Sequence, residues 1–199
     1  MDVQARVEGV FRAHPDVLHV NLVGSRASGT PTPLSDWDFQ LETANGQRLA
    51  AELPDLVAKL DPLGALWDPL SDRATYCAVF PGAIKVDFFP GDETHEPSSP
   101  LDVVAENLRP IDAHFWDWLL WLGAKQLGGR DNLVQSELVS MNDFILHRLG
   151  VAESPPTLPR AVDGYLAART RQEHALGVVV DPALGTAVIR ALRQHGILD

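Results

Sequence analysis

The sequence predicts an α+β protein in which a small mixed sheet with helices is followed by an α-helical bundle. Segments of the length and pattern typical of β-strands occur only before residue 91. From Leu101 onward the apolar residues recur at helical spacing. Residues 91–100 hold turn formers and no apolar residue except proline. We therefore predict a core over residues 1–90, a linker over 91–100 and a helical domain over 101–199.

Length and composition favour a globular protein of the cytoplasm. The chain has 199 residues, 45% of them hydrophobic, which suffices for a packed core. No stretch approaches the roughly 20 apolar residues of a membrane-spanning helix, and the N-terminus lacks a signal-peptide pattern. The single Cys77 cannot form an internal disulfide. We expect a cytoplasmic location and no membrane partner.

The charge balance bears on the class of substrate. Lys and Arg number 16 against 27 Asp and Glu, a formal net charge of −11. Such a surface repels phosphates, and the chain has no Lys/Arg-rich run, so a nucleic-acid partner is disfavoured. A negative cleft would attract a polycationic small molecule. The other reading is that acidity only keeps the protein in solution.

The first half is expected to alternate helices with strands. Asp2 is a suitable N-cap for a helix that Pro15 bars from continuing. Residues 19–23 form a short apolar run that predicts a buried strand ending at Gly24. Residues 36–42 alternate polar and apolar side chains, which predicts a strand with one wet face.

A helix and three further strand segments complete this half. Residues 47–60 predict a helix that restarts at Pro54. Residues 64–70 predict a strand or edge segment. Residues 73–80 and 84–89 predict a hairpin around a Pro-Gly turn.

The second half is expected to contain four helices. Their predicted spans are residues 112–127, a helix capped by Asp131 or Asn132 that ends at Gly150, a helix from the 154–159 loop to about Leu176, and a helix from Asp181-Pro182 to Gly196.

Three residues after the first predicted strand are candidates for binding a phosphate. Gly24 lets backbone N–H groups approach an anion, Ser25 adds a hydroxyl donor, and Arg26 adds positive charge. Taken alone, a Gly-Ser pair is more often only a turn.

Asp36 and Asp38 are candidate metal ligands. Residues i and i+2 of a strand point the same way, so both carboxylates should project together. Their repulsion would be relieved by a divalent cation. Taken alone, the pair is more often a solvated strand edge.

Asp87 is a third candidate, because it lies within an apolar strand. A buried carboxylate is costly unless it is paired or bound to a metal. A salt bridge with a nearby arginine is the structural alternative.

Two residues of the helical half could also reach a site. Lys125 follows Trp118 and Leu122 at helical spacing, and its ammonium could bind an anion or simply extend into solvent at a helix end. Glu137 lies at the edge of an apolar stripe, where it could accept a proton from an acceptor hydroxyl or bind a cationic acceptor. A pairing of Glu137 with Arg130 or Arg148 is the alternative.

The combination of these motifs resembles a known superfamily. Gly24-Ser25, ten further residues and Asp36-x-Asp38 are similar to the signature of the DNA polymerase β-like nucleotidyltransferases, with Asp87 as the later carboxylate. The chain resembles most the small aminoglycoside or lincosamide nucleotidyltransferases, and also the minimal subgroup. That subgroup commonly carries Ala-Arg-Gly where this chain has Ala27-Ser28-Gly29.

The resemblance implies a function for each residue. Gly24 and Ser25 would hold the triphosphate, with Arg26 and Lys125 assisting. Asp36, Asp38 and Asp87 would hold Mg²⁺, and Asp87 could act as base. The enzyme would move a nucleoside monophosphate, AMP, from ATP to a hydroxyl of a small cationic acceptor such as an aminoglycoside, releasing pyrophosphate and conferring antibiotic resistance; Glu137 would contact the acceptor.

Two other functions stay open at this point. The chain could be a nucleotidyltransferase of the antitoxin kind that adenylylates a partner protein. It could also be a non-catalytic nucleotide-binding homologue, although the presence of all three carboxylates favours catalysis.

Overall fold

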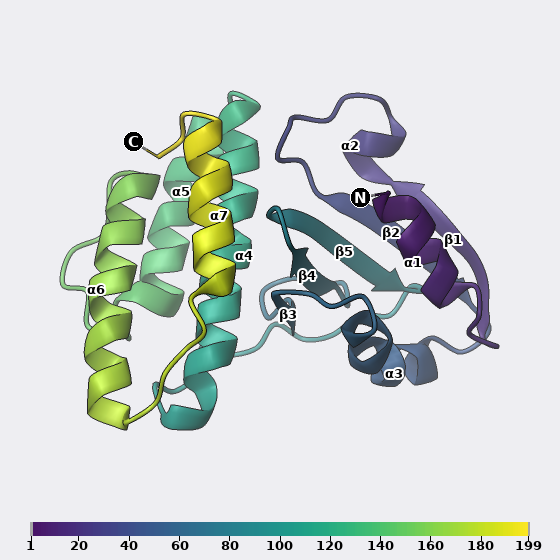
Figure 1. The fold of residues 1–199 in the computed structure, drawn as a ribbon, viewed down its shortest axis with the longest axis horizontal. Helices are drawn as coiled ribbons and strands as arrows, with labels where there is room; N and C mark the ends of the chain where they lie inside the picture. Colours follow the sequence, from purple (N-terminus) through teal and green to yellow (C-terminus); the bar gives the residue numbers. More distant parts are fainter. Residues whose placement is uncertain (1, 199) are drawn as a thin grey trace. The chain divides into compact units, whose positions relative to one another are not determined.

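The chain forms two compact units, which divide between Ser98 and Ser99 (Figure 1). The computed structural model describes residues 2–198. Over these residues the chain contains a small mixed five-stranded sheet and seven α-helices, so the predicted α+β class is confirmed. No helix within residues 2–198 combines the length and apolar character needed to cross a membrane.

The N-terminal unit is built on one sheet with strand order β1-β2-β5-β4-β3. The pair β2–β5 is parallel and the other three pairs are antiparallel. The strands are β1 (Val17–Val23), β2 (Trp37–Thr43), β3 (Gly64–Trp67), β4 (Tyr76–Phe80) and β5 (Ile84–Pro90).

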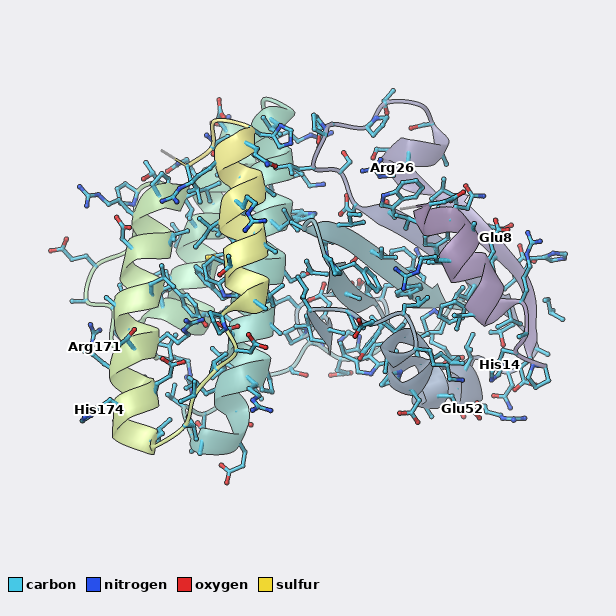
Figure 2. The ribbon with its side chains drawn as sticks, in the orientation of Figure 1. Glu8, His14, Arg26, Glu52, Arg171 and His174 are labelled. Carbon is cyan, nitrogen blue, oxygen red and sulfur yellow. The ribbon has the colours of Figure 1, made fainter. Side chains whose placement is uncertain are left out.

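Helices α1 (Val3–Phe11) and α3 (Gly46–Ala58) contribute to the core of this unit. The strands contribute the side chains of one sheet face, among them Phe39 and Phe88, whose rings lie 6.2 Å apart. Outside the core, the imidazole of His14 lies 2.8 Å from the carboxylate of Glu52 (Figure 2). Because strand side chains alternate, the residues between the core residues, including Asp38 and Asp87, lie on the opposite face.

Several predicted elements of this unit need correction. The strand expected over 36–42 begins at Trp37, so Asp36 lies just before it. Residues Gly24–Ala27 form a single helical turn, α2, rather than an irregular turn. The restart predicted at Pro54 is wrong: α3 runs through it, because leucines before and after the proline pack into the core and hold the helix together.

The predicted hairpin is confirmed. Strands β4 and β5 pair in antiparallel fashion, and Phe80 faces Ile84 across the turn. Gly82 and Ala83 take left-handed φ values of 88° and 56° in that turn. The strand predicted over 64–70 is shorter and ends at Trp67, since the next residues bond in a turn in which Leu70 N donates to the side chain of Asp68.

The second unit is helical, as predicted. Its α-helices are α4 (Leu108–Leu127), α5 (Asp131–Met141), α6 (Leu158–Leu176) and α7 (Ala183–Gln194), and its shorter elements are the 3₁₀ turn η1 (Ala105–Asn107) and the π-helical turn η2 (Asn142–Leu146).

The boundaries of two helices differ from the prediction. Helix α4 begins at Leu108, so Asp112 lies inside it rather than at its start; Pro110 falls in the first turn, where a missing N–H is tolerated. The helix expected to run to Gly150 is α-helical only to Met141 and then widens into η2. Arg130, not Asp131 or Asn132, is its N-cap.

A polar network is buried inside the helical unit. Asp112, only 3% exposed, accepts hydrogen bonds at Oδ1 from the Trp116 indole (3.0 Å), the Tyr165 hydroxyl (2.6 Å) and the Arg169 guanidinium (3.0 Å). Burial and the neighbouring Asp112 raise the pKa of Tyr165 well above its ordinary value. A Cβ at Gly185 of α7 would lie 2.7 Å from the Trp116 ring, so α7 approaches this network closely.

Candidate functional site

The register of the sheet brings the three predicted carboxylates together. In the parallel pair β2–β5, Asp38 faces Asp87, and on the other side of β2 it faces Val23. Asp36 lies two residues before Asp38, on the segment that enters β2. One carboxylate oxygen from each of Asp36, Asp38 and Asp87 lies within 4.8 Å of the others.

Local sequence explains why these residues share a face. Asp38 lies between Trp37 and Phe39 on β2, and Asp87 lies between Val86 and Phe88 on β5. The apolar neighbours pack into the core or against it, so the alternation of the pleat directs both carboxylates away from it. Asp36 and Asp38 are half-buried, whereas Asp87 is buried.

Gly24 lies directly against the Asp38 carboxylate. Its φ of 69° is in the left-handed region, and a Cβ built on it would lie 2.2 Å from Oδ2 of Asp38. Any side chain here would be strained and would displace the carboxylate. Glycine is therefore required for the chain after β1 to pass beside the carboxylates.

Ser25 belongs to the turn α2, whose main chain is stabilised by hydrogen bonds to residues a few positions further along the chain. The Ser25 carbonyl accepts from the Thr30 amide (2.9 Å) and from the Ser28 hydroxyl (3.1 Å). These contacts fix the backbone of the turn next to Gly24. The role of Ser25 in binding a triphosphate stays a prediction.

Arg26 organises the loop before β2. Its Nε donates to the main-chain carbonyls of Ser35 (3.1 Å) and Asp36 (3.0 Å), and its guanidinium lies 4.4 Å from the centre of the Trp37 ring. Burial lowers the pKa of Arg26, while the charges of Asp36 and Asp38 act in the opposite direction. Figure 2 labels Arg26 on the turn α2. In this structure Arg26 holds Asp36 in place; contact with a nucleotide stays a prediction.

Lys85 is a site residue that the sequence interpretation missed. Its Nζ lies 2.7 Å from Oδ1 of Asp87, and both side chains are buried. The structural alternative considered for Asp87 was an arginine, but the partner is this lysine. The sequence did contain an indication of this pair, because residues 85 and 87 of one strand lie on the same face of the sheet.

Lys125 and Glu137 belong to the helical unit. The Lys125 ammonium lies over the Trp121 ring, 4.7 Å from its centre, in the last turn of α4. Glu137 of α5 accepts a hydrogen bond from the Trp118 indole at 3.0 Å. A partner for Glu137 had been expected in Arg130 or Arg148, and the indole is the one found. Contact of either residue with a nucleotide or acceptor stays a prediction.

The donor set fits a hard divalent cation. Carboxylate oxygens are the ligands that Mg²⁺ prefers, and Mg²⁺ commonly uses one or two carboxylates together with substrate phosphates. Gly24, which has no side chain, leaves the Asp38 carboxylate uncovered by a Cβ on that side. The three carboxylates could therefore hold such an ion, and the absence of a side chain at Gly24 leaves Asp38 unobstructed on that side.

Comparison with known proteins adds no family assignment. No protein-family profile matches this chain, and neither does any curated protein sequence at a significant level.

Proposed function

We propose that the N-terminal unit is the catalytic core of a magnesium-dependent nucleotidyltransferase of the DNA polymerase β-like kind. The enzyme would transfer a nucleoside monophosphate, AMP, from ATP to a hydroxyl of a small cationic acceptor such as an aminoglycoside. The observation that carries the proposal is the alignment of Asp38 with Asp87 in a parallel strand pair beside Gly24.

Each residue has a chemical task in this reaction. Asp36, Asp38 and Asp87 would hold Mg²⁺, which when bound supplies positive charge to the triphosphate and favours ionisation of the acceptor hydroxyl. Gly24 and the main chain of Ser25 would accommodate the phosphates. Lys125 is a candidate for further phosphate contact, and Glu137 for contact with the acceptor.

The bonds exchanged are those of an in-line displacement. The acceptor oxygen forms a bond to the α-phosphorus, and the bond from that phosphorus to the bridging oxygen breaks. Pyrophosphate leaves with the electron pair. The hydroxyl proton goes to a base, for which Asp87 is the candidate within the cluster.

The distribution of charge supports a cationic acceptor. Residues 1–98 contain 15 of the 27 acidic residues but only 7 of the 16 Lys and Arg. A region of one sign raises the local concentration of ligands of the opposite sign. Most of the excess of negative charge thus lies in the unit that carries the carboxylate cluster.

The test is mass spectrometry after incubation with Mg²⁺, mixed nucleoside triphosphates and a panel of aminoglycosides and lincosamides. We expect an acceptor heavier by one nucleoside monophosphate, formed by the wild type and not by Asp38→Asn. Asp55→Asn, at an exposed position of α3, is the matched control and should keep the activity.

Other outcomes redirect the proposal. Magnesium-dependent binding of the triphosphate without any modified antibiotic would exclude this acceptor class, and a partner protein would become the next acceptor to test. Absence of both binding and transfer would overturn the proposed activity.

A further inference from the structure

The carboxylate cluster contains its own cation. Lys85 is 5% exposed, and its Nζ lies 2.7 Å from Asp87 Oδ1. Asp87 is also a member of the cluster, because one of its carboxylate oxygens lies within 4.8 Å of an oxygen from Asp36 and an oxygen from Asp38. The ammonium is thus bonded to a member of the cluster itself.

The other nearby cation differs from Lys85 in its bonding. The charge of Arg26 interacts with Asp36 and Asp38, but its Nε donates to main-chain carbonyls and the face of its guanidinium lies over Trp37. Arg26 therefore fixes the loop, whereas Lys85 neutralises a carboxylate at hydrogen-bond distance. Three neighbouring carboxylates repel one another, and an ammonium held this close reduces the repulsion.

We infer that Lys85 is a built-in counter-cation of the proposed metal site, a positioning residue that holds Asp87 and lowers the affinity of the carboxylates for a divalent ion. This inference rests on the metal site of the proposed function. An ion entering the cluster meets the positive charge of Lys85, which shares Asp87 with it. Lys85 therefore stabilises the cluster without metal and opposes tight retention of the metal.

The inference separates Lys85 from an ordinary buried ion pair. An ion pair that serves only the fold contributes the same stability with and without metal. A counter-cation contributes most when metal is absent, because a bound ion takes over the compensation of charge.

The first measurement is Mn²⁺ affinity, from the free Mn²⁺ signal in electron paramagnetic resonance. Lys85→Met keeps an unbranched chain and removes the charge. We expect it to bind Mn²⁺ about tenfold more tightly or better, since one unit charge a few ångströms away acts strongly even at an effective dielectric constant of about 20. Lys85→Arg, which keeps the charge, and Lys59→Met at an exposed position should resemble the wild type.

The second measurement is thermal unfolding of the same variants in EDTA and in saturating Mn²⁺. In EDTA, Lys85→Met should have a lower melting temperature than the wild type. Saturating Mn²⁺ should reduce or reverse this difference in melting temperature. Should Lys85→Met fail to fold, Lys85→Gln serves as the neutral variant and carries the same expectations.

The outcomes distinguish this inference from the proposed function. If the wild type binds Mn²⁺ and the neutral variants bind it equally or more weakly, Lys85 is not a counter-cation and the inference is overturned alone. An equal loss of melting temperature with and without Mn²⁺ overturns it as well. If the wild type binds Mn²⁺ no better than Asp38→Asn, the metal site itself fails, and this inference fails with it.

Discussion

Two clusters of charged side chains, one in each unit, differ in the ratio of acids to donors. In the helical unit one carboxylate, Asp112, accepts from three donors, including Arg169. In the N-terminal unit the cluster of Asp36, Asp38, Asp87 and Lys85 has three carboxylates to one ammonium. The first arrangement satisfies its charge internally, as a structural network must. The second gathers three carboxylates beside one ammonium, with the Arg26 guanidinium nearby, and a bound cation would further reduce the repulsion among the carboxylates.

This contrast predicts opposite consequences for the same substitution in the two units. Asp38→Asn should lower nucleotide transfer by more than the roughly 10–100-fold expected for loss of a residue that only supports a metal ligand. Stability should change little, since the substitution removes one of three like charges. Steady-state rates together with urea unfolding measure both. Full activity in this variant would remove the distinction between the clusters.

The matching substitution in the helical unit should act on the fold. Asp112→Asn removes the buried anion of Arg169 and leaves it the Glu173 carboxylate at 3.7 Å. Breaking a buried ion pair by removing one partner costs about 3–5 kcal/mol. Urea unfolding of the full chain, followed by helical circular dichroism, provides the value. Asp163→Asn, at an exposed pair with Arg160 (4.0 Å), should cost less than about 1 kcal/mol. Equal losses in the two variants would contradict the assigned role of Asp112.

Two glycines sharpen the comparison, because they share a conformation and differ in surroundings. Gly24 and Gly29 have φ values of 69° and 74°, but only Gly24 has a carboxylate where a Cβ would lie. Each alanine variant should lose about 1–2 kcal/mol from the left-handed backbone. Gly24→Ala should also weaken Mn²⁺ binding, whereas Gly29→Ala should leave it intact. Equal Mn²⁺ affinity in both variants would show that the contact with Asp38 is unimportant.

The smallest expected effect concerns the chain's two tyrosines at alkaline pH. Burial raises the pKa of both Tyr76 and Tyr165 above 10.0. The unfolded chain releases these protons near pH 10 while the folded protein retains them, so stability falls as pH rises above 10, by up to about 1.4 kcal/mol per pH unit for each group. Urea unfolding between pH 9 and 11 should show a shallower decline for Tyr165→Phe. If the free energy of unfolding declined with pH equally steeply in Tyr165→Phe and the wild type, the burial of Tyr165 beside Asp112 would not retain its hydroxyl proton.

The sequence predicted the carboxylates of the site better than their surroundings. Alternation over residues 36–42 was enough to predict that Asp36 and Asp38 project together, because the period of a strand is local. Asp87 was joined to them only through the resemblance to a nucleotidyltransferase motif. The partner strand of β2 was not predictable, since pairing across the sheet is non-local. Lys85 was not predicted because an arginine is the more usual partner of a buried carboxylate. Asp112 was interpreted as a helix start rather than a buried acceptor.

The parallel pairing of β2 with β5 has a consequence for folding kinetics. The antiparallel pairs β1–β2 and β4–β5 join neighbours in sequence, whereas β2–β5 joins strands separated by α3, β3 and β4. Non-local pairing forms late because its loop must close first. We therefore expect Asp38 and Asp87 to come together late in folding, when the β1–β2 pair docks on the β4–β5 hairpin. A divalent ion bound between Asp38 and Asp87 would link β2 to β5. It should slow unfolding while leaving the rate of refolding nearly unchanged.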